Sequence, residues 1–307
     1  MYSLGGEISF IAQATTDKTN MAAETTAAVT TASLTQIRMQ HASIGNPSVA
    51  GYVSGGQGGG AFRSTSDKVT FSNDTTTAVA TAAISQNRNA LSGLSERSTK
   101  GYVAGGTTGA FNQLATADKL TFSSETDSAV GSANLSTARY LPSGMSEGTS
   151  KGYWGGGDTG GGATNMKITD KITFSTDTTG AIASAQLSVA RGESCAGGDG
   201  STKGYWGGGC SSGQNNPATG ITDKITFSTD TTLALMSASF TKGGPCAAGS
   251  DGNKLVGLGG LDGSAVVTSS GLKITFATDS TAAFGSGSAG NLSAARYFLA
   301  GISTVAL

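Results

Sequence analysis

The stretch KGYWGGGDTGGGATNMKITDKITFSTDT, residues 151–178, returns almost unchanged as KGYWGGGCSSGQNNPATGITDKITFSTDT at residues 203–231. Each version reads as a short apolar strand, a glycine-rich loop and a second strand. In the preceding copy Leu120 and Phe122 alternate with Thr121 and Ser123, which is the period of two expected of a strand. The strands are conserved between the copies, whereas the loop between them changes in length and composition. The repeated strands therefore decide the fold, and the changing loop is where function is sought.

The repeat runs along the whole chain in six copies, which start near residues 1, 51, 101, 152, 204 and 255. The Tyr of the GY pair lies at Tyr2, Tyr52, Tyr102, Tyr153 and Tyr205, with Val256 in the sixth copy. The Lys of the DK pair lies at Lys18, Lys68, Lys119, Lys171, Lys224 and Lys273. An Arg closes segments such as LSTAR at Arg38, Arg88, Arg139, Arg191 and Arg296, and the spacing places Gly244 at the remaining position.

Each copy divides into four short strand-like pieces, and helix signals are nearly absent. Four antiparallel strands per repeat of about fifty residues are typical of a propeller blade. The chain begins in a second strand, YSLGG, and residues 296–307 supply a first strand. We therefore predict an all-β, single-domain, six-bladed β-propeller over residues 1–307, closed by the C-terminal strand joining the N-terminal three strands.

The pattern of an Arg before the inner strand, a GYVAGG strand and an aromatic residue in the third strand resembles the kelch repeat in all six copies. One departure is that kelch repeats usually carry a Trp near the start of the fourth strand, where this chain has Val79, Val130 and Ile182. Its two Trp residues, Trp154 and Trp206, lie beside the GY pair instead. The fuller phrase KGYxxGG…DKITFSTDT…LSxAR is similar to repeats of bacteriophage virion proteins, particularly those of cyanobacteria.

Composition and charge limit the classes of partner that we expect for this chain. The 307 residues carry a formal net charge of −1 with 13% charged residues, so no electrostatic footprint for nucleic acid is expected. No apolar run approaches the roughly 20 residues of a membrane span, and the N-terminus does not read as a signal peptide. Cys195, Cys210 and Cys246 show no CxxC spacing and no even-numbered framework, so neither a disulfide scaffold nor a zinc site is indicated, and free thiols are expected. Cys195 and Cys246 occupy equivalent places before Ala in the first strand, which predicts small buried thiols.

Residues that recur in every copy are expected to be structural. The Gly pairs, such as Gly105 and Gly106, are expected in turns with positive φ, and the third-strand Phe residues between blades. Adjacent Asp and Lys of the DK pair should point to opposite sides of their strand, which argues against joint acid–base chemistry. The recurrent Arg residues could form a cationic ring at the channel mouth, or could bond to backbone carbonyls or a neighbouring carboxylate.

We expect no catalytic residues, metal ligands or cofactor, and hence no enzyme. The single His41 cannot supply the histidines of a galactose oxidase-like copper site, and no GxSxG elbow accompanies it. A packed or solvated His41 is the simpler interpretation. The segment GGGDTGGG at residues 155–162 lacks the Gly-Lys-Ser/Thr and the helix of a phosphate-binding loop.

Length variation concentrates in the loop between the second and third strands, and these loops should share one face of the disc. The candidate binding residues there are Phe62, Arg63, Phe111, Asn112, Gln113, Asp158, Asn165, Gln214, Asn215 and Asn216. They could dock on a neighbouring subunit or bind a sugar. We expect a virion protein of a tail, fibre or capsid-associated structure, within a larger assembly, with other virion proteins or host surface glycans as partners. A carbohydrate-binding propeller that recognises host surface polysaccharide is the alternative.

Overall fold

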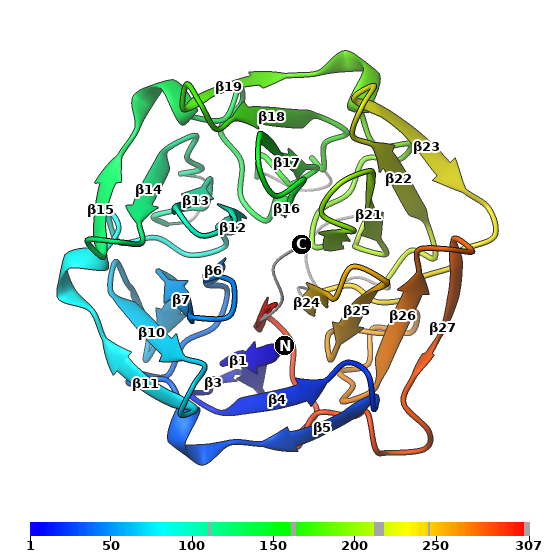
Figure 1. Ribbon diagram of the computed structural model, residues 1–307, viewed down its shortest axis with the longest axis horizontal. Coiled ribbons are helices and arrows are strands. Elements are labelled where there is room, and N and C mark those ends of the chain that lie inside the picture. The colour runs from blue at the N-terminus through cyan, green and yellow to red at the C-terminus, as the bar shows by residue number, and fades with distance from the viewer. Residues whose placement is uncertain (110–111, 161–163, 212–217, 245, 304–307) are drawn as a thin grey trace.

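The computed structural model describes residues 1–109, 112–160, 164–211, 218–244 and 246–303. Six four-stranded antiparallel sheets surround a central axis as the blades of a β-propeller (Figure 1). The predicted all-β, six-bladed fold is therefore confirmed. Within the described part of the chain, no helix has the length and apolarity needed to cross a membrane.

Each blade runs from an inner strand beside the axis to an outer strand at the rim. We number the blades 1 to 6 in chain order, and blade 1 is the one that contains both β1 and β28. From inner to outer strand, the blades are β28 (Ala300–Ile302), β1 (Tyr2–Leu4), β4 (Thr16–Asn20) and β5 (Thr25–Ala28); β6 (Ala42–Asn46), β7 (Ala50–Ser54), β10 (Ser66–Thr70) and β11 (Thr75–Ala78); β12 (Ser92–Glu96), β13 (Lys100–Ala104), β14 (Ala117–Thr121) and β15 (Thr126–Ala129); β16 (Ser143–Ser146), β17 (Lys151–Gly155), β18 (Thr169–Thr173) and β19 (Thr178–Ala181); β20 (Cys195–Gly198), β21 (Lys203–Gly207), β22 (Thr222–Thr226) and β23 (Thr231–Leu235); and β24 (Ala247–Ser250), β25 (Lys254–Leu258), β26 (Gly271–Thr275) and β27 (Ser280–Phe284).

Short elements decorate this frame. Two hairpins lie between the second and third strands of blades 1 and 2, namely β2 (Glu7–Ile8) with β3 (Ile11–Ala12) and β8 (Gln57–Gly58) with β9 (Ala61–Phe62). Single-turn 3-10 helices follow the outer strands of blades 1 to 4, namely η1 (Thr30–Ala32), η2 (Ala80–Ala82), η3 (Gly131–Ala133) and η4 (Ala183–Ala185).

The C-terminal strand closes the ring as predicted. In blade 1, β28 pairs antiparallel with β1, with Leu4 opposite Ala300 and Tyr2 opposite Ile302. Because the two ends of the chain share one sheet, opening the ring requires breaking hydrogen bonds within a blade.

The two faces of each blade carry different side chains, which contact different neighbours. Tyr52 is opposite Lys68, and Val53 is opposite Asp67, so Tyr and Lys share one face of blade 2 while Asp points to the other. The Tyr–Lys face looks toward blade 3, where Lys68 pairs with Glu125, and Asp67 looks toward the connection that arrives from blade 1. The predicted divergence of the DK pair is confirmed.

A clamp recurs between successive blades. Its acid lies in the turn between the third and fourth strands of the next blade, with a left-handed backbone at Glu24, Asp74, Glu125, Asp177, Asp230 and Asp279. In one clamp Tyr153 and Lys171 both donate hydrogen bonds to Asp230, at 2.5 and 2.7 Å. Burial acts to raise the pKa of Asp230, but hydrogen bonds from Lys171, Tyr153 and Lys151 outweigh it and lower the pKa to about 2.

Aromatic stacking reinforces the same seams. The predicted packing of third-strand Phe residues between blades is confirmed, with ring centroids 5.2–5.8 Å apart in the pairs Tyr2–Phe71, Tyr52–Phe122, Tyr102–Phe174, Tyr153–Phe227 and Tyr205–Phe276. At the seam between blades 6 and 1, Val256 and Met21 take these places and lie in one apolar cluster. Each seam therefore combines an apolar contact, which is an aromatic stack at five seams, with a partly buried ion pair.

Candidate functional site: the variable-loop face

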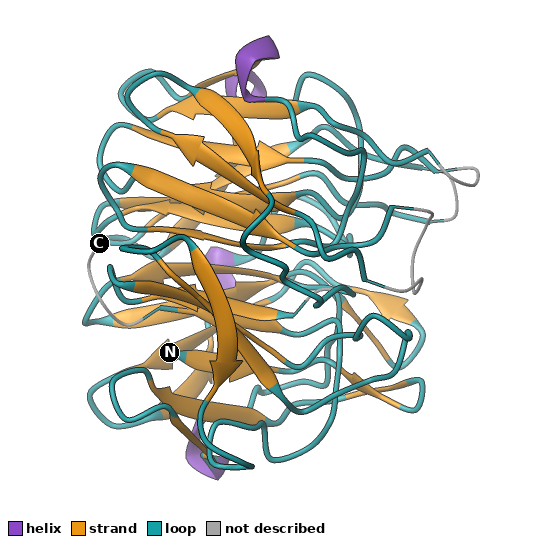
Figure 2. Cartoon of the chain, turned by 90° about the vertical axis from the view of Figure 1, so that its right-hand side faces the viewer, coloured by secondary structure: helices purple, strands orange, loops and turns teal. Residues whose placement is uncertain are grey.

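The connections between the second and third strands, residues 5–15, 55–65, 105–116, 156–168, 208–221 and 259–270, define what we call the variable-loop face. Because successive strands alternate in direction, these connections and those between blades emerge on the same side of the disc, which Figure 2 shows edge-on. The tight turns after the first and third strands lie on the opposite side. The predicted gathering of the loops on one face follows from this topology.

The Gly-Gly pair that opens each loop is needed for close backbone approach. Both glycines of each pair have positive φ, as at Gly105 (73°) and Gly106 (100°). A Cβ on Gly105 would lie 2.7 Å from the carbonyl oxygen of Arg139, and the amide of Gly106 donates to that same oxygen at 3.0 Å. The pair thus packs the start of each loop against the connection to the next blade.

The recurrent Arg residues do not form a cationic ring. Arg139 is fully buried, pairs with Asp170 at 2.7 Å and donates to the carbonyl of Trp154 at 3.2 Å. Burial lowers the pKa of Arg139, and Asp170 opposes that effect. The same pairs form at Arg38–Asp67, Arg88–Asp118, Arg191–Asp223 and Arg296–Asp17. The alternative interpretation, a bond to carbonyls and a carboxylate, is the one that holds.

The fifth position of this series, which the spacing assigned to Gly244, was misassigned. The carbonyl of Lys242, not that of Gly244, accepts the hydrogen bond from the second Gly of the loop, Gly209, at 2.9 Å. Lys242 therefore stands in the Arg position, and the connection is two residues shorter than in the earlier copies. The partner changes too, because Leu272 opposite Ala283 fills the place of the Asp. A constant twenty-residue spacing could not reveal this shortening.

A ring of left-handed residues surrounds the channel mouth on the variable-loop face. These residues stand two places after each buried cation and are Gln40, Ala90, Leu141, Glu193, Gly244 and Phe298. The amide of Ala90 donates to the Gln40 carbonyl and that of Leu141 to the Ala90 carbonyl, both at 2.7 Å. Because backbone groups form this ring, its members share no residue type, and no sequence pattern indicates it.

The predicted site residues of blade 2, Phe62 and Arg63, lie at the end of the β8–β9 hairpin and directly after it. Phe62 ends the β8–β9 hairpin and is half-buried. Arg63 donates to the side-chain oxygen of Gln36 at 2.6 Å and to the carbonyl of Gly58 at 3.0 Å. The guanidinium therefore joins this hairpin to the connection from blade 1.

The predicted site residues of blades 3 and 4 differ in their exposure and in the groups that they contact. Asn112 is exposed and bonds to Thr108 in its own loop. Gln113 reaches toward blade 4, since a Cβ on Gly160 would meet its side-chain nitrogen.

Asp158 is buried and accepts hydrogen bonds from the amide of Gly160 at 2.6 Å and the hydroxyl of Thr164 at 2.5 Å. The side chain of Asn165 donates to the carbonyl of Cys210 in blade 5 at 2.9 Å. Asp158 therefore stabilises its own loop, and Asn165 joins this loop to that of blade 5. Phe111, Gln214, Asn215 and Asn216 lie outside the described residues.

Sequence reasoning overlooked a group of exposed apolar side chains on this face. Phe10 and Ile11 at the tip of the β2–β3 hairpin are 89% and 62% exposed, and Ile37 is 41% exposed. The bridge between Gln13 and Arg38 places the segment that carries Ile37 beside the β2–β3 hairpin, and β3 contacts β8. Val266 in the loop of blade 6 and Met236 after β23 are also exposed. The signal available was the pair Ser9–Phe10 at a position where blade 2 has Gly59–Gly60.

The central channel holds two cavities of about 150 Å³ each, lined mainly by Ser, Ala and Gly of the inner strands. His41 borders the cavity nearer the variable-loop face and is buried. Burial, followed by the charge of Arg38, lowers the pKa of His41 to about 3, so the imidazole is neutral. The packed interpretation of His41 is confirmed. Across the described residues, no three His, Cys, Asp or Glu side chains are grouped so as to hold a metal ion.

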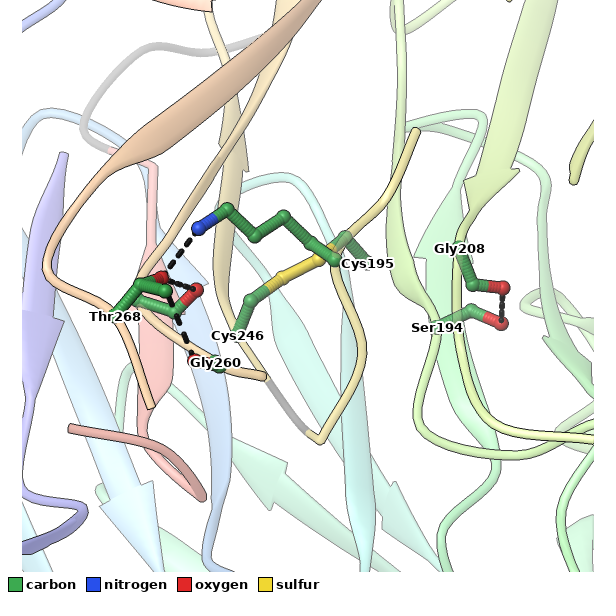
Figure 3. Close-up of a disulfide and its surroundings, with 8 residues drawn as sticks. Ser194, Cys195, Gly208, Cys246, Gly260 and Thr268 are labelled. Carbon is green, nitrogen blue, oxygen red and sulfur yellow. Dashed lines mark hydrogen bonds between the residues drawn. A yellow bond between two sulfur atoms is a disulfide. The ribbon is translucent and has the colours of Figure 1, made fainter. Parts of the chain in front are cut away.

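The expectation of free thiols was wrong for two of the three cysteines. Cys195 opens β20 and Cys246 precedes β24, and the two form a disulfide between neighbouring inner strands with their Cα atoms 5.9 Å apart (Figure 3). Their separation of 51 residues is one repeat, so adjacent blades bring them together near the axis. Cys210 is not part of a disulfide and is buried.

Comparison with protein-family models and with curated proteins finds no match for this chain.

Proposed function

We propose that the chain is a non-enzymatic binding module of a bacteriophage virion that docks onto another virion protein through its variable-loop face. The observation that supports it best is the β2–β3 hairpin, which presents Phe10 and Ile11 outward from a rigid ring. Exposed loops on a rigid scaffold are where binding commonly resides. The resemblance of the repeat phrase to virion proteins supplies the biological setting.

The turn of the β2–β3 hairpin has a strained backbone, and packing inside the molecule does not explain this strain. Ser9 and Phe10 both have left-handed backbone, with φ of 49° and 65°. In the matching hairpin of blade 2, Gly59 and Gly60 take these positions with φ of 61° and 80°. A two-residue turn of this kind favours Gly or Asn, and a bulky residue with positive φ is an outlier. Backbone strain together with an exposed aromatic side chain is typical of a residue that contacts a binding partner.

The chemistry around the hairpin favours a protein partner. Charged side chains nearby are already used inside the ring: Arg63 bonds to Gln36, and Glu7 accepts from the hydroxyl of Tyr297 at 3.0 Å. A surface with an exposed aromatic ring and exposed Ile side chains, beside charges that are already bonded, suits an uncharged apolar hollow on another protein.

Carbohydrate binding is the second candidate, and the exposed Phe10 ring is the observation that favours it. An aromatic face can stack on a sugar ring, and the exposed Asn112 could bond to hydroxyls. The neighbours of Phe10 are Ile side chains rather than the polar groups a sugar needs, which places this candidate second.

The test compares the full chain with Phe10→Gly and Leu233→Ala. Leu233 is an exposed apolar residue on an outer strand, away from the variable-loop face, and serves as the matched control. Binding to proteins released from purified virions, measured by sedimentation, should weaken by roughly 10–100-fold for Phe10→Gly, since burying a Phe contributes about 1.5–3 kcal/mol.

Leu233→Ala should bind like the original chain. Equal loss in both variants, or no loss in Phe10→Gly, would contradict docking through the hairpin. Specific binding to a glycan array that disappears in Phe10→Gly would instead support the carbohydrate candidate.

A further inference from the structure

The seam between blades 5 and 6 lacks the anchor that the other seams share. Elsewhere a buried Arg in the incoming connection pairs with the third-strand Asp, as Arg191 does with Asp223 at 2.7 Å. That Asp also accepts from a backbone amide of the connection, as from Ser188 at 3.2–3.3 Å. At the blade 5–6 seam Lys242 and Leu272 replace the pair, so the carboxylate that receives both bonds is missing.

Lys242 is a weaker replacement. Its ammonium donates to the hydroxyls of Thr268 and of Ser270, the latter at 2.9 Å. Two neutral acceptors do not compensate a buried cation as a carboxylate does. In agreement, burial lowers the pKa of Lys242 to about 8. In the described part of the chain, this connection also has no 3-10 helix, unlike the four before it.

The disulfide lies at the same seam and at the same end of the blades. Cys195 is four residues after Arg191 and Cys246 four after Lys242, so the bond joins inner strands beside the missing anchor. Figure 3 shows Cys246 near Gly260 and Thr268 of blade 6. Among the other contacts of this seam, the Tyr205–Phe276 stack and the bond from Lys224 to Asp279 lie toward the opposite face. Phe240 of the connection packs in the apolar cluster between the two blades.

The bond can be reached from the channel. Cys246 lines the channel cavity of about 150 Å³ together with Ser194, Ala196 and Ala248. A small thiol that enters the channel would therefore meet this sulfur.

We propose that the Cys195–Cys246 disulfide is a redox latch that replaces the Arg–Asp anchor at the blade 5–6 seam. Two molecules of a small thiol reduce it: one thiolate attacks a cystine sulfur, the second cleaves the mixed disulfide, and two protein thiols and one small-molecule disulfide result. With the latch closed, the seam is as firm as its neighbours. With the latch open, the connection keeps the packing of Phe240 and the Gly243–Leu261 bridge but has no buried ion pair, and this seam becomes the first to separate.

Hydrogen-exchange mass spectrometry of the full chain, with and without dithiothreitol, tests the latch. Reduction should speed exchange of β20 and β24 amides by at least about tenfold, while β12 and β16, which lie at seams with an intact Arg–Asp pair, stay unchanged. Cys210→Ser should respond like the original chain. Cys195→Ser/Cys246→Ser should exchange fast without reductant; if it does not fold, the reductant comparison on the original chain decides.

A restored anchor gives the second test. Lys242→Arg/Leu272→Asp supplies the pair found at the other seams and should slow exchange of β20 and β24 in reductant at least several-fold. Unchanged exchange on reduction, or an equal rise in all blades, would overturn the latch. Failure of the double replacement to slow exchange would overturn the claim that the latch stands in for the anchor.

Discussion

Replacing His41 with Leu should remove a specific part of the acid sensitivity of this fold. His41 stands three residues after Arg38, against Gly5 and Gly56, in the place that Leu91 and Leu299 fill in other blades. Its folded-state pKa of about 3 lies below the ordinary value of 6.5 because burial disfavours the imidazolium. The unfolded chain therefore binds a proton that the folded chain excludes between pH 6.5 and 3, and stability is lost as the pH falls through that range.

The size of the effect follows from those two pKa values. Between pH 7 and pH 5 the linkage costs the original protein about 2 kcal/mol through His41, and it costs His41→Leu nothing through this position. The difference between the two proteins is the proper measure, because Asp127 titrates with the opposite sign in the same range. Burial, followed by Asp118, raises the pKa of Asp127 to about 8, so that residue destabilises the fold as the pH rises.

Urea unfolding at pH 7 and pH 5 measures this difference directly. The free energy of unfolding of His41→Leu relative to the original protein should increase by about 2 kcal/mol on going from pH 7 to pH 5. A relative free energy that is the same at both pH values would refute the inference that His41 is held neutral by burial.

Three further substitutions test other parts of the account. Asp127→Thr, which restores the residue of the other five copies, should raise the unfolding free energy by about 2–3 kcal/mol more at pH 7 than at pH 5, because the cost of the raised pKa grows with pH; a gain independent of pH would argue against it. Gly105→Ala should destabilise by about 2–4 kcal/mol in thermal melts, since its Cβ would lie 2.7 Å from the Arg139 carbonyl oxygen, whereas Gly180→Ala, with no atom within 4 Å, should change stability little; similar melting of the two variants would contradict the close-approach argument. Cys195→Ser/Cys246→Ser should cost about 4 kcal/mol of unfolding free energy, given a loop of 51 residues, and the intact oxidised chain should be lighter than the fully reduced chain by two hydrogen atoms; an unchanged mass on reduction would show that no bond forms.

The fold was predictable because its repeating unit occurs six times along the sequence. The GY, DK and Arg markers fixed the blade count, the direction of the DK side chains and the packing of Phe122 and its equivalents, since repeated residues report repeated contacts. The phase of the two ends predicted the pairing of β28 with β1. These features depend on local spacing and on the period of a strand, which a sequence displays directly.

The candidate site was harder to predict because it depends on departures from the repeat. Arg63 and Asn165 look like ligand-binding residues in sequence, yet they bond to neighbouring segments, which only the closed ring brings near. Asp158 is used inside its own loop, where it accepts from Gly160. The Cys195–Cys246 bond depends on the convergence of two inner strands. Phe10 was hidden because its strain becomes visible only when its turn is superposed on Gly60 of blade 2.

Docking through the variable-loop face can be measured in intact purified virions by cross-linking mass spectrometry. Lys167 is exposed on the variable-loop face, and Lys18, with a side chain 44% exposed, lies on the side of a blade that the clamp turns occupy. We predict that the chain is present in the particles and that a lysine-reactive reagent joins Lys167, but not Lys18, to another virion protein. Absence of the chain from the particles, or cross-links to other proteins from Lys18 alone, would contradict it.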